Sequence, residues 1–361
     1  MGNPFPLKAN SNKSFQGSII LGKGFVLTTE EAQRLLNKDP RNKDVLFPYL
    51  NGDDLNNDPE QKPSRWVINF FDWSEEKART YHDCFKILEE RVKPERQRWK
   101  LDKNGNEIVG TYALRRPLPQ KWWIYGEKRP ALYNTISKLD QVMVMNRYTK
   151  YLAIDFQPQN VVFSDSIIAF ALDSFHHFSI FSSSIHEIWA WKNSSTMGSS
   201  TLRYSPTNAF ETFPLQIHLD EESKDIGIEL NKLRKSVMTK FCIGFTELYN
   251  LFHEIGYNKD DELKDAILKL RYIHCMLDRA ILKQYEWEDI ELNHDFYEME
   301  YLPENDRIRY TIHPYARKEI LNRLLQLNHK LHKTEIELQP ISMNKLKVNK
   351  STQVIDLFSK E

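Results

Sequence analysis

Hydrophobic residues follow two different patterns along this chain, and the change falls near residue 214. Before it, short β-branched and aromatic runs alternate with turn formers, which is typical of strands joined by loops and short helices. After it, apolar residues recur every three or four positions over long stretches, which is the spacing of one helical face. The pattern predicts an α+β fold with a mixed domain over residues 1–214, an all-helical domain over residues 215–345 and a flexible tail over residues 346–361.

Short elements are expected throughout the mixed domain. Strands are predicted where β-branched and aromatic residues cluster, at residues 65–71, 142–146, 152–156, 161–163 and 167–171. Helices are predicted where a capping residue, a proline or helical spacing marks them, at residues 28–36, 75–92, 130–139 and 175–189. Residues 17–27 fit a strand pair or a β-turn, and residues 99–120 fit an irregular basic loop.

The second domain contains three predicted helices, over residues 221–255, 261–284 and 314–336. The first two carry complementary apolar stripes and are separated by turn formers, so they predict an αα-hairpin. Cys242 and Cys275 fall in these helices and are expected to be buried. No pair of the three cysteines has the CxxC spacing, which predicts reduced cytoplasmic thiols.

Net charge and targeting signals limit the possible functions only broadly. The 50 basic and 50 acidic residues cancel, so any DNA-binding face must be local. No window holds the roughly 18 consecutive apolar residues of a membrane span, and the N-terminus lacks the basic start and apolar core of a secretory signal. The N-terminal Met-Gly matches the start of a myristoylation signal, but Pro6 stands where that signal needs Ser or Thr. A cytoplasmic protein is therefore expected.

Strings that resemble nucleotide, nuclease or metal sites are each incomplete. Residues 17–24 match the G-x4-G-K of a phosphate-binding loop, but Gly24 replaces the hydroxyl residue that binds the metal. The acid-x-Lys pairs at residues 60–62 and 75–77 fall in loop or helix-start sequence, so they are predicted to be solvated charge. His176 and its neighbour His177 have no second Cys/His cluster nearby, so no metal site is expected.

The sequence motifs needed for methyl transfer and for hydrolysis are also incomplete. Transfer to adenine N6 needs an Asn/Asp-Pro-Pro-aromatic loop, and residues 3–5 lack the second proline. No glycine-rich cofactor loop follows a strand. A hydrolase built on His186 and Asp165 would need an oxyanion site that the sequence does not show. No catalytic residue is predicted in this chain.

Lysine, arginine, tryptophan and tyrosine crowd residues 91–130. Cationic groups neutralise phosphate charge, and arginine can read guanine through a pair of hydrogen bonds. The alternative is a surface of ordinary exposed charge with tryptophan in the core. Both interpretations stay open on composition alone.

A set of collinear strings resembles one family. The strings lie at residues 12–18, 47–56, 92–96, 122–132, 163–165, 184–189, 202–206 and 210–214, and further on at residues 248–253, 277–280 and 320–328. In this order they resemble the target-recognition domain and helical C-terminal region of MmeI-like (type IIL) restriction–modification DNA methyltransferases. The similarity covers residues 10–345, nearly the whole chain.

The resemblance implies a module that reads a short asymmetric sequence of double-stranded DNA and positions a catalytic domain over an adenine flipped for methylation. The family's enzymes also carry a nuclease and an adenine methyltransferase, whose motifs are absent here. S-adenosylmethionine and Mg²⁺ are implied only for those domains, and no cofactor is expected in this chain. The implied partners are double-stranded DNA and a methyltransferase/nuclease domain or subunit.

Residue roles follow from the same resemblance. Base-reading side chains are expected in the segment with Met197, Gly198, Ser199, Ser200, Thr201 and Arg203. A second group of candidate groove contacts comprises Arg147, Tyr148 and Lys150. Phosphate contacts are expected from Arg96, Arg98, Arg115, Arg116, Lys128 and Arg129. Residues 47–56 are expected to form a structural turn that caps and orients the strand at 65–71.

Two other hypotheses stay open beside DNA recognition. The first is a protein–protein adaptor that docks a partner with the helical hairpin, which predicts an exposed apolar patch on residues 221–284. The second is an enzyme of unrecognised class around His186 and Asp165. The adaptor and DNA-recognition hypotheses are compatible, because a specificity module must also dock its methyltransferase.

Overall fold

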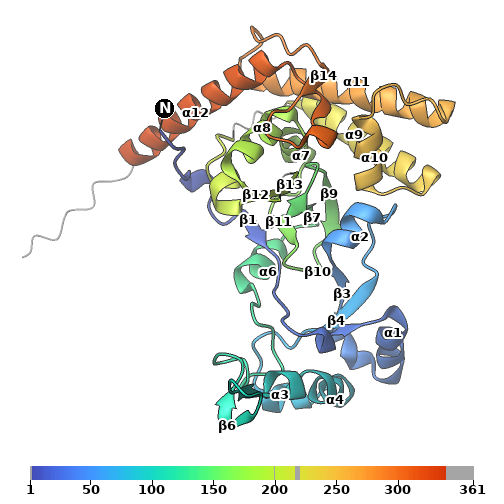
Figure 1. Ribbon diagram of the computed structural model, residues 1–361, viewed down its shortest axis with the longest axis vertical. Helices are drawn as coiled ribbons and strands as arrows, with labels where there is room; N and C mark the ends of the chain where they lie inside the picture. Colours follow the sequence, from blue (N-terminus) through green and yellow to red (C-terminus); the bar gives the residue numbers. More distant parts are fainter. Residues whose placement is uncertain (1, 199, 216–219, 339–361) are drawn as a thin grey trace, which may run out of the picture.

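The computed structural model describes residues 2–198, 200–215 and 220–338. Four helices gather at one end of the long axis (Figure 1): α9 (Glu221–Phe241), α10 (Phe245–Phe252), α11 (Asp261–Gln284) and α12 (Pro314–Glu337). The sheets occupy the middle. The other end holds α1 (Thr29–Lys38), α3 (Glu75–Arg79), α4 (His82–Arg91) and the hairpin of β5 (Trp99–Leu101) and β6 (Glu107–Tyr112). The α+β class and the helical C-terminal region are confirmed.

A four-stranded antiparallel sheet forms the centre. Its order is β1 (Ser14–Gln16), β11 (Ile167–Phe170), β7 (Gln141–Asn146) and β9 (Ile154–Pro158). Side chains alternate between the two faces of a strand. Val142 and Val144 accordingly pack into one core cluster, whereas Met143 and Met145 pack into another on the opposite face. Both faces of this sheet are therefore covered.

A second four-stranded sheet connects the centre to the α1–α4 end. Its order is β10 (Val162–Phe163), β3 (Leu46–Leu50), β4 (Arg65–Ile68) and β2 (Val26–Leu27). The segment 47–56 forms most of β3 and of the helix α2 (Gly52–Asn57). Asn51 and Asp54 form a capping box at the N-terminus of α2. Asp54 also accepts a 2.6 Å hydrogen bond from the Ser64 hydroxyl, directly before β4. The segment is thus structural, and it is tied to the strand it was expected to orient.

Two predicted helices are each split in two. Residues 75–92 form α3 and α4, because Tyr81 leaves helical geometry to pack on Trp73 and to donate a hydrogen bond to Asp44. Residues 175–189 fall in α7 (Phe175–Phe181) and α8 (Ser184–Asn193). The remaining short elements are α5 (Lys93–Arg96), α6 (Pro130–Ile136), η1 (Lys8–Asn10), η2 (Lys23–Phe25), η3 (Pro40–Asp44), η4 (Pro206–Phe210) and η5 (Glu304–Asp306).

The helical end departs from the prediction in three places. The expected helix 221–255 breaks into α9 and α10 at Cys242, which adopts a left-handed conformation and is exposed rather than buried. Position 244, just after this break, requires glycine, because a Cβ there would lie 2.4 Å from the Asn56 carbonyl oxygen. A hairpin of β14 (Asp295–Glu298) and β15 (Ile308–Thr311) also interrupts the helices, so the region is not all-helical. Strand pairing of this kind leaves little trace in a sequence when the strands are short.

One large hydrophobic cluster joins the sheet region to the helical region. It combines Met145 and Phe170 of the central sheet with Leu230 of α9 and Leu277 of α11. The two predicted domains therefore share a core across residue 214. The predicted tail, residues 346–361, lies outside the described residues. Within the described parts of the chain, no helix is long and apolar enough to cross a membrane.

Candidate nucleic-acid interface

The two segments predicted to read bases lie in one small sheet. It consists of β12 (Ser195–Met197), β13 (Thr201–Arg203) and β8 (Tyr148–Thr149), in the order β12–β13–β8. Arg203 pairs with Ser195 on one side and with Tyr148 on the other, and Leu202 pairs with Thr149. The structure thereby brings the 197–203 segment against the 147–150 segment.

Strand alternation decides which side chains of this sheet reach solvent. Leu202 is fully buried in the large core, so its neighbours Thr201 and Arg203 point to the opposite, outer face. Residues directly opposite one another share a face, which adds Tyr148 and the 56% exposed Met197. The outer face therefore combines a guanidinium, a phenol, a hydroxyl and a thioether.

Gly198, directly after β12, stands clear of the rest of the described fold. Gly198 has a φ of +67°, a conformation that favours glycine, and no atom lies within 4 Å of where its Cβ would be. Ser200 is partly buried and leads directly into β13. Ser199, also predicted to read bases, lies outside the described residues.

Helix α8 supports this sheet from behind. Tyr204, directly after β13, is fully buried, and its backbone N–H donates to the Arg147 carbonyl at 2.9 Å. Its hydroxyl lies 3.1 Å from Nε2 of His186 on α8. Burial lowers the pKa of His186 to about 3, so this imidazole is neutral. His186 is thus a core residue packed against Phe181 and Tyr204, while Asp165 is exposed, which removes the basis for a hydrolase pair.

Arg147 and Lys150 differ in whether their charges are paired within the described fold. Arg147 is partly buried and stacks 5.3 Å from the Tyr148 ring, and it forms no ion pair among the described residues. Lys150 instead pairs with Asp306 at 2.8 Å and donates to the Asn250 side chain at 3.2 Å. These contacts tie the chain after β8 to the helical region, and the predicted groove contact of Lys150 stays a prediction.

Arg96 is a buried structural residue, which corrects its assignment to phosphate. Its guanidinium has no solvent exposure and donates to the carbonyls of Ile124, Ile20 and Leu21, the last two at 2.8 Å. Burial lowers its pKa to about 10. The guanidinium donates its hydrogen bonds to these carbonyls inside the fold, so phosphate cannot reach it.

The other five predicted phosphate contacts fall into two groups. Lys128 pairs with Asp72 at 2.6 Å, and Arg129 lies 3.8 Å from Glu127. The remaining three are exposed, take part in no ion pair between described residues, and flank the β5–β6 hairpin: Arg98, Arg115 and Arg116. Unpaired cations attract phosphate more strongly than cations whose charge is already compensated. These three therefore fit the predicted role best.

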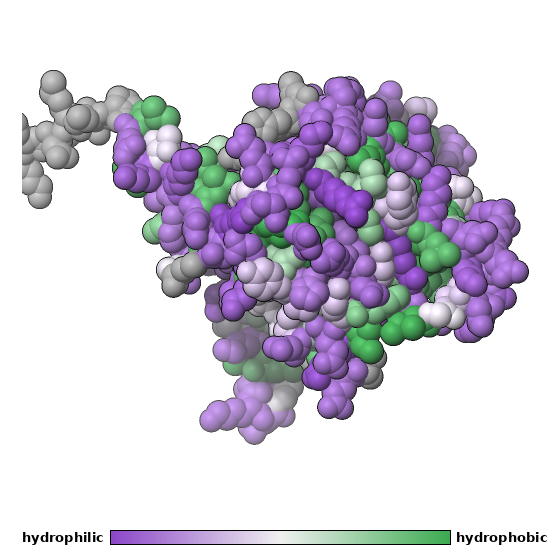
Figure 2. Space-filling view, turned by 90° about the horizontal axis from the view of Figure 1, so that it is seen from above, coloured by the Kyte–Doolittle hydropathy of each residue, from purple (hydrophilic) through white to green (hydrophobic). Residues whose placement is uncertain are grey.

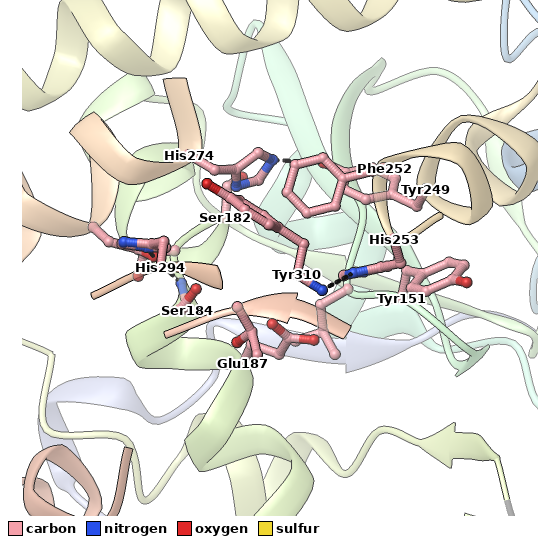
Figure 3. A pocket seen from close by; sticks show the side chains of 14 residues that line it. Tyr151, Ser182, Ser184, Glu187, Tyr249, Phe252, His253, His274, His294 and Tyr310 are labelled. Carbon is pink, nitrogen blue, oxygen red and sulfur yellow. Dashed lines mark hydrogen bonds and ion pairs between the residues drawn. The ribbon is translucent and has the colours of Figure 1, made fainter. Parts of the chain in front are cut away.

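A buried polar cavity lies between the sheet region and the helices (Figure 3). Its volume is about 40 Å³, which admits a few water molecules and excludes a nucleobase. Its labelled lining comprises Tyr151, Ser182, Ser184, Glu187, Tyr249, Phe252, His253, His274, His294 and Tyr310. It is therefore no pocket for a flipped base, and no group of three or more metal-ligating side chains occurs in the described parts of the chain.

An ion pair beside this cavity fastens three elements together. Asp278 of α11 is fully buried, accepts from the Ser184 backbone N–H at 2.7 Å and lies 2.8 Å from Nε2 of His294. Burial opposes the charged form of His294, but its hydrogen bonds to Asp278 and Cys275 outweigh burial and raise its pKa to about 9. Burial lowers the pKa of the nearby His274 to about 4. No spacing in the sequence indicates this pair, because its members meet only through tertiary packing.

Comparison with known proteins adds two findings. Residues 6–217, more than half of the chain, match the family model described as "MmeI, target recognition domain". Among solved structures, a type IIL restriction–modification enzyme, MmeI, in complex with DNA is similar at 14% identity, with a TM-score of 0.52. The match covers 92% of this chain but 37% of that chain, so the likeness concerns the fold of about a third of the enzyme. The comparison with curated proteins found no match.

Proposed function

We propose that this chain, which belongs to the MmeI target recognition domain family, reads a short sequence of double-stranded DNA and positions a partner methyltransferase over an adenine in that sequence. The observation that carries the proposal is the β12–β13–β8 sheet. It joins both predicted base-reading segments on one outward face, with Arg203 opposite Tyr148.

The chemistry of this face suits a DNA groove. Arginine can donate two parallel hydrogen bonds to guanine, and hydroxyl groups such as that of Thr201 donate to or accept from several bases. Met197 offers an apolar contact that suits a thymine methyl group. A two-stranded ribbon such as β12–β13 also has a width that the major groove accepts. Arg98, Arg115 and Arg116 would hold the duplex by its phosphates.

The proposed partners follow from the family, since the similar solved structure is a restriction–modification enzyme of which the match covers 37%. In the proposal, a methyltransferase or nuclease domain or subunit carries out catalysis, and S-adenosylmethionine and Mg²⁺ bind there rather than here. The cytoplasm is the expected compartment because the substrate is cellular DNA.

Selection from a duplex pool tests this function directly. The purified chain is mixed with random double-stranded DNA, and the retained molecules are sequenced at two salt concentrations. Enrichment of a short common sequence supports the proposal. Retention that shows salt dependence but no common sequence would reduce the function to nonspecific DNA binding, and no retention at low salt would refute it.

A second function, docking of a partner protein on the helices, is favoured by a separate observation. Ile255, Leu268 and Tyr272 on or beside α11 are exposed by 60%, 49% and 63%. Figure 2, the view onto the helical end, shows a mainly hydrophilic surface with hydrophobic residues between the polar ones. Leu268 and Tyr272 lie four residues apart on α11 and so share one helix face, which makes that face a candidate contact site. A Leu268→Asp variant that still binds DNA but fails to bind its methyltransferase would assign docking to this surface.

A further inference from the structure

The β5–β6 hairpin is an isolated element at the end of the molecule opposite the long helices (Figure 1). Its two strands pair only with each other. Residues 107–111 on β6 are all exposed, which means that neither face of the hairpin is covered. A lone two-stranded hairpin is marginally stable in water, so its shape must be held by local contacts.

Two local contacts hold the hairpin. At its base, the rings of Trp99 and Tyr112 stack with centroids 4.8 Å apart. At its tip, the Asp102 carboxylate accepts from the backbone N–H groups of Asn104 and Asn106 at 2.8 and 2.9 Å. The second contact matters for charge as well. Asp102 is one of two acidic residues in the hairpin, and its oxygens are engaged by the turn.

The hairpin leaves apolar side chains in water. Leu101, Ile108 and Val109 are exposed by 56%, 40% and 77%. Each would gain free energy by leaving water, so contact of any of them with a partner would be favourable. None of the described residues buries them, which leaves this surface free to contact a partner.

The charges around the hairpin indicate which occupant. Five exposed cations lie on it or at its base and take part in no ion pair between described residues: Arg98, Lys100, Lys103, Arg115 and Arg116. The acids Asp102 and Glu107 leave a net charge of +3 for this set. A basic ribbon that carries exposed apolar side chains on its strands is complementary to a nucleic-acid groove, where phosphates border the apolar edges of sugars and bases.

We propose that the β5–β6 hairpin is an arm that enters a groove of duplex DNA outside the target sequence, with Lys100 and Lys103 on phosphates and Val109 at the groove floor. A two-stranded ribbon has the width that a groove accepts. The β12–β13–β8 sheet lies in the middle of the molecule and the hairpin at its end, so the arm contacts flanking DNA (Figure 1). This inference rests on the proposed function, and it adds a sequence-independent contact to it.

Duplex length separates the arm from the base-reading sheet. The full chain is measured against two duplexes that share the selected target, one with short flanks and one extended by about two helical turns on each side. The parent is expected to bind the longer duplex more tightly. Lys100→Ala combined with Lys103→Ala should abolish that gain and reduce the salt slope by roughly two on the longer duplex only. Val109→Ser should reduce the gain without changing the slope.

A matched pair of exposed lysines away from the hairpin serves as control. Lys43→Ala combined with Lys330→Ala removes the same charge, and neither lysine is in an ion pair with a described residue. The control is expected to keep the gain from longer flanks. Equal affinity of the parent for both duplexes, or an unchanged gain in the Lys100/Lys103 variant, would overturn the arm while leaving sequence selection intact. Failure of the parent to select any sequence would instead refute the proposed function itself.

Discussion

Arg203 on β13 lies directly across from Tyr148 on β8, and the two strands are joined by backbone hydrogen bonds. The two residues come from segments that are distant in the sequence, yet their side chains share the outer face of one sheet. A base that contacts one of them lies within reach of the other. If this sheet reads bases as proposed, sequence preference should depend on the pair rather than on either segment alone.

Arg203→Ala should change which base is preferred at one position of the target. Loss of a bidentate arginine contact costs roughly 1–3 kcal/mol of discrimination at the base it reads. The measurement is a repeat of the duplex selection with the variant. Arg34→Ala, an exposed arginine on α1 in no ion pair with a described residue, is the control. An Arg203 variant with the parent's preference at every position would remove this residue from base reading.

Arg115→Ala combined with Arg116→Ala should weaken binding to every duplex alike. These side chains are exposed and free of ion pairs in the described structure, so each removed charge should lower the salt slope by roughly one. Lys128→Ala should lower it less, because Asp72 already compensates this charge at 2.6 Å. Titrations at several salt concentrations check both. Equal slopes for the two variants would contradict the division of the cations into paired and unpaired groups.

Arg96→Ala should destabilise the fold, whereas Arg98→Ala, two positions later, should not. The first leaves buried carbonyls of Ile20, Leu21 and Ile124 without a donor, at a cost of roughly 3 kcal/mol or more in the free energy of unfolding. The second removes an exposed side chain, which changes stability by less than about 0.5 kcal/mol. Urea denaturation of the two variants provides the comparison. Similar stabilities would show that the carbonyls find other partners.

The contrast between these two arginines shows what the sequence could predict. Composition placed both in one basic, aromatic segment, and the residue pattern placed β7, β9 and β11 of the central sheet, but not β1, and the start of most helices. Which arginine turns inward depends on carbonyls of residues 20, 21 and 124, which only the folded chain brings together. For the same reason the pairing of β8 with β13 was not predictable from either strand alone. The hairpin at 99–112 was missed because its exposed strands lack the apolar alternation of a half-buried sheet.

His294 should give the stability of the fold a dependence on pH above neutrality. Its pKa is about 9 in the folded chain and 6.5 in an unfolded one, so the folded state holds the extra proton between these values. The stabilisation, roughly 3 kcal/mol at most, is complete below pH 6.5 and is lost as the pH rises through about 9. His294→Gln should therefore lower the free energy of unfolding at pH 6 but much less at pH 10. Urea titrations at both pH values measure this, and an equal loss at both would exclude the charged pair with Asp278.

Asp306→Asn should reduce sequence discrimination although residue 306 lies outside the base-reading sheet. Asp306 pairs with Lys150 at 2.8 Å and with Arg309 at 2.7 Å, and Arg309 donates to the Tyr151 hydroxyl at 3.0 Å. These contacts hold the chain immediately after β8 against the β14–β15 hairpin. Losing the carboxylate costs roughly 1–3 kcal/mol of stability and frees β8 to shift relative to β13. The ratio of affinities for target and non-target duplexes should fall, while the salt slope stays near that of the parent because no phosphate contact is removed.

Asp306→Glu keeps the charge and should restore much of the ratio. A variant that loses stability but keeps the parent's affinity ratio would show that Asp306 supports the fold without positioning Tyr148.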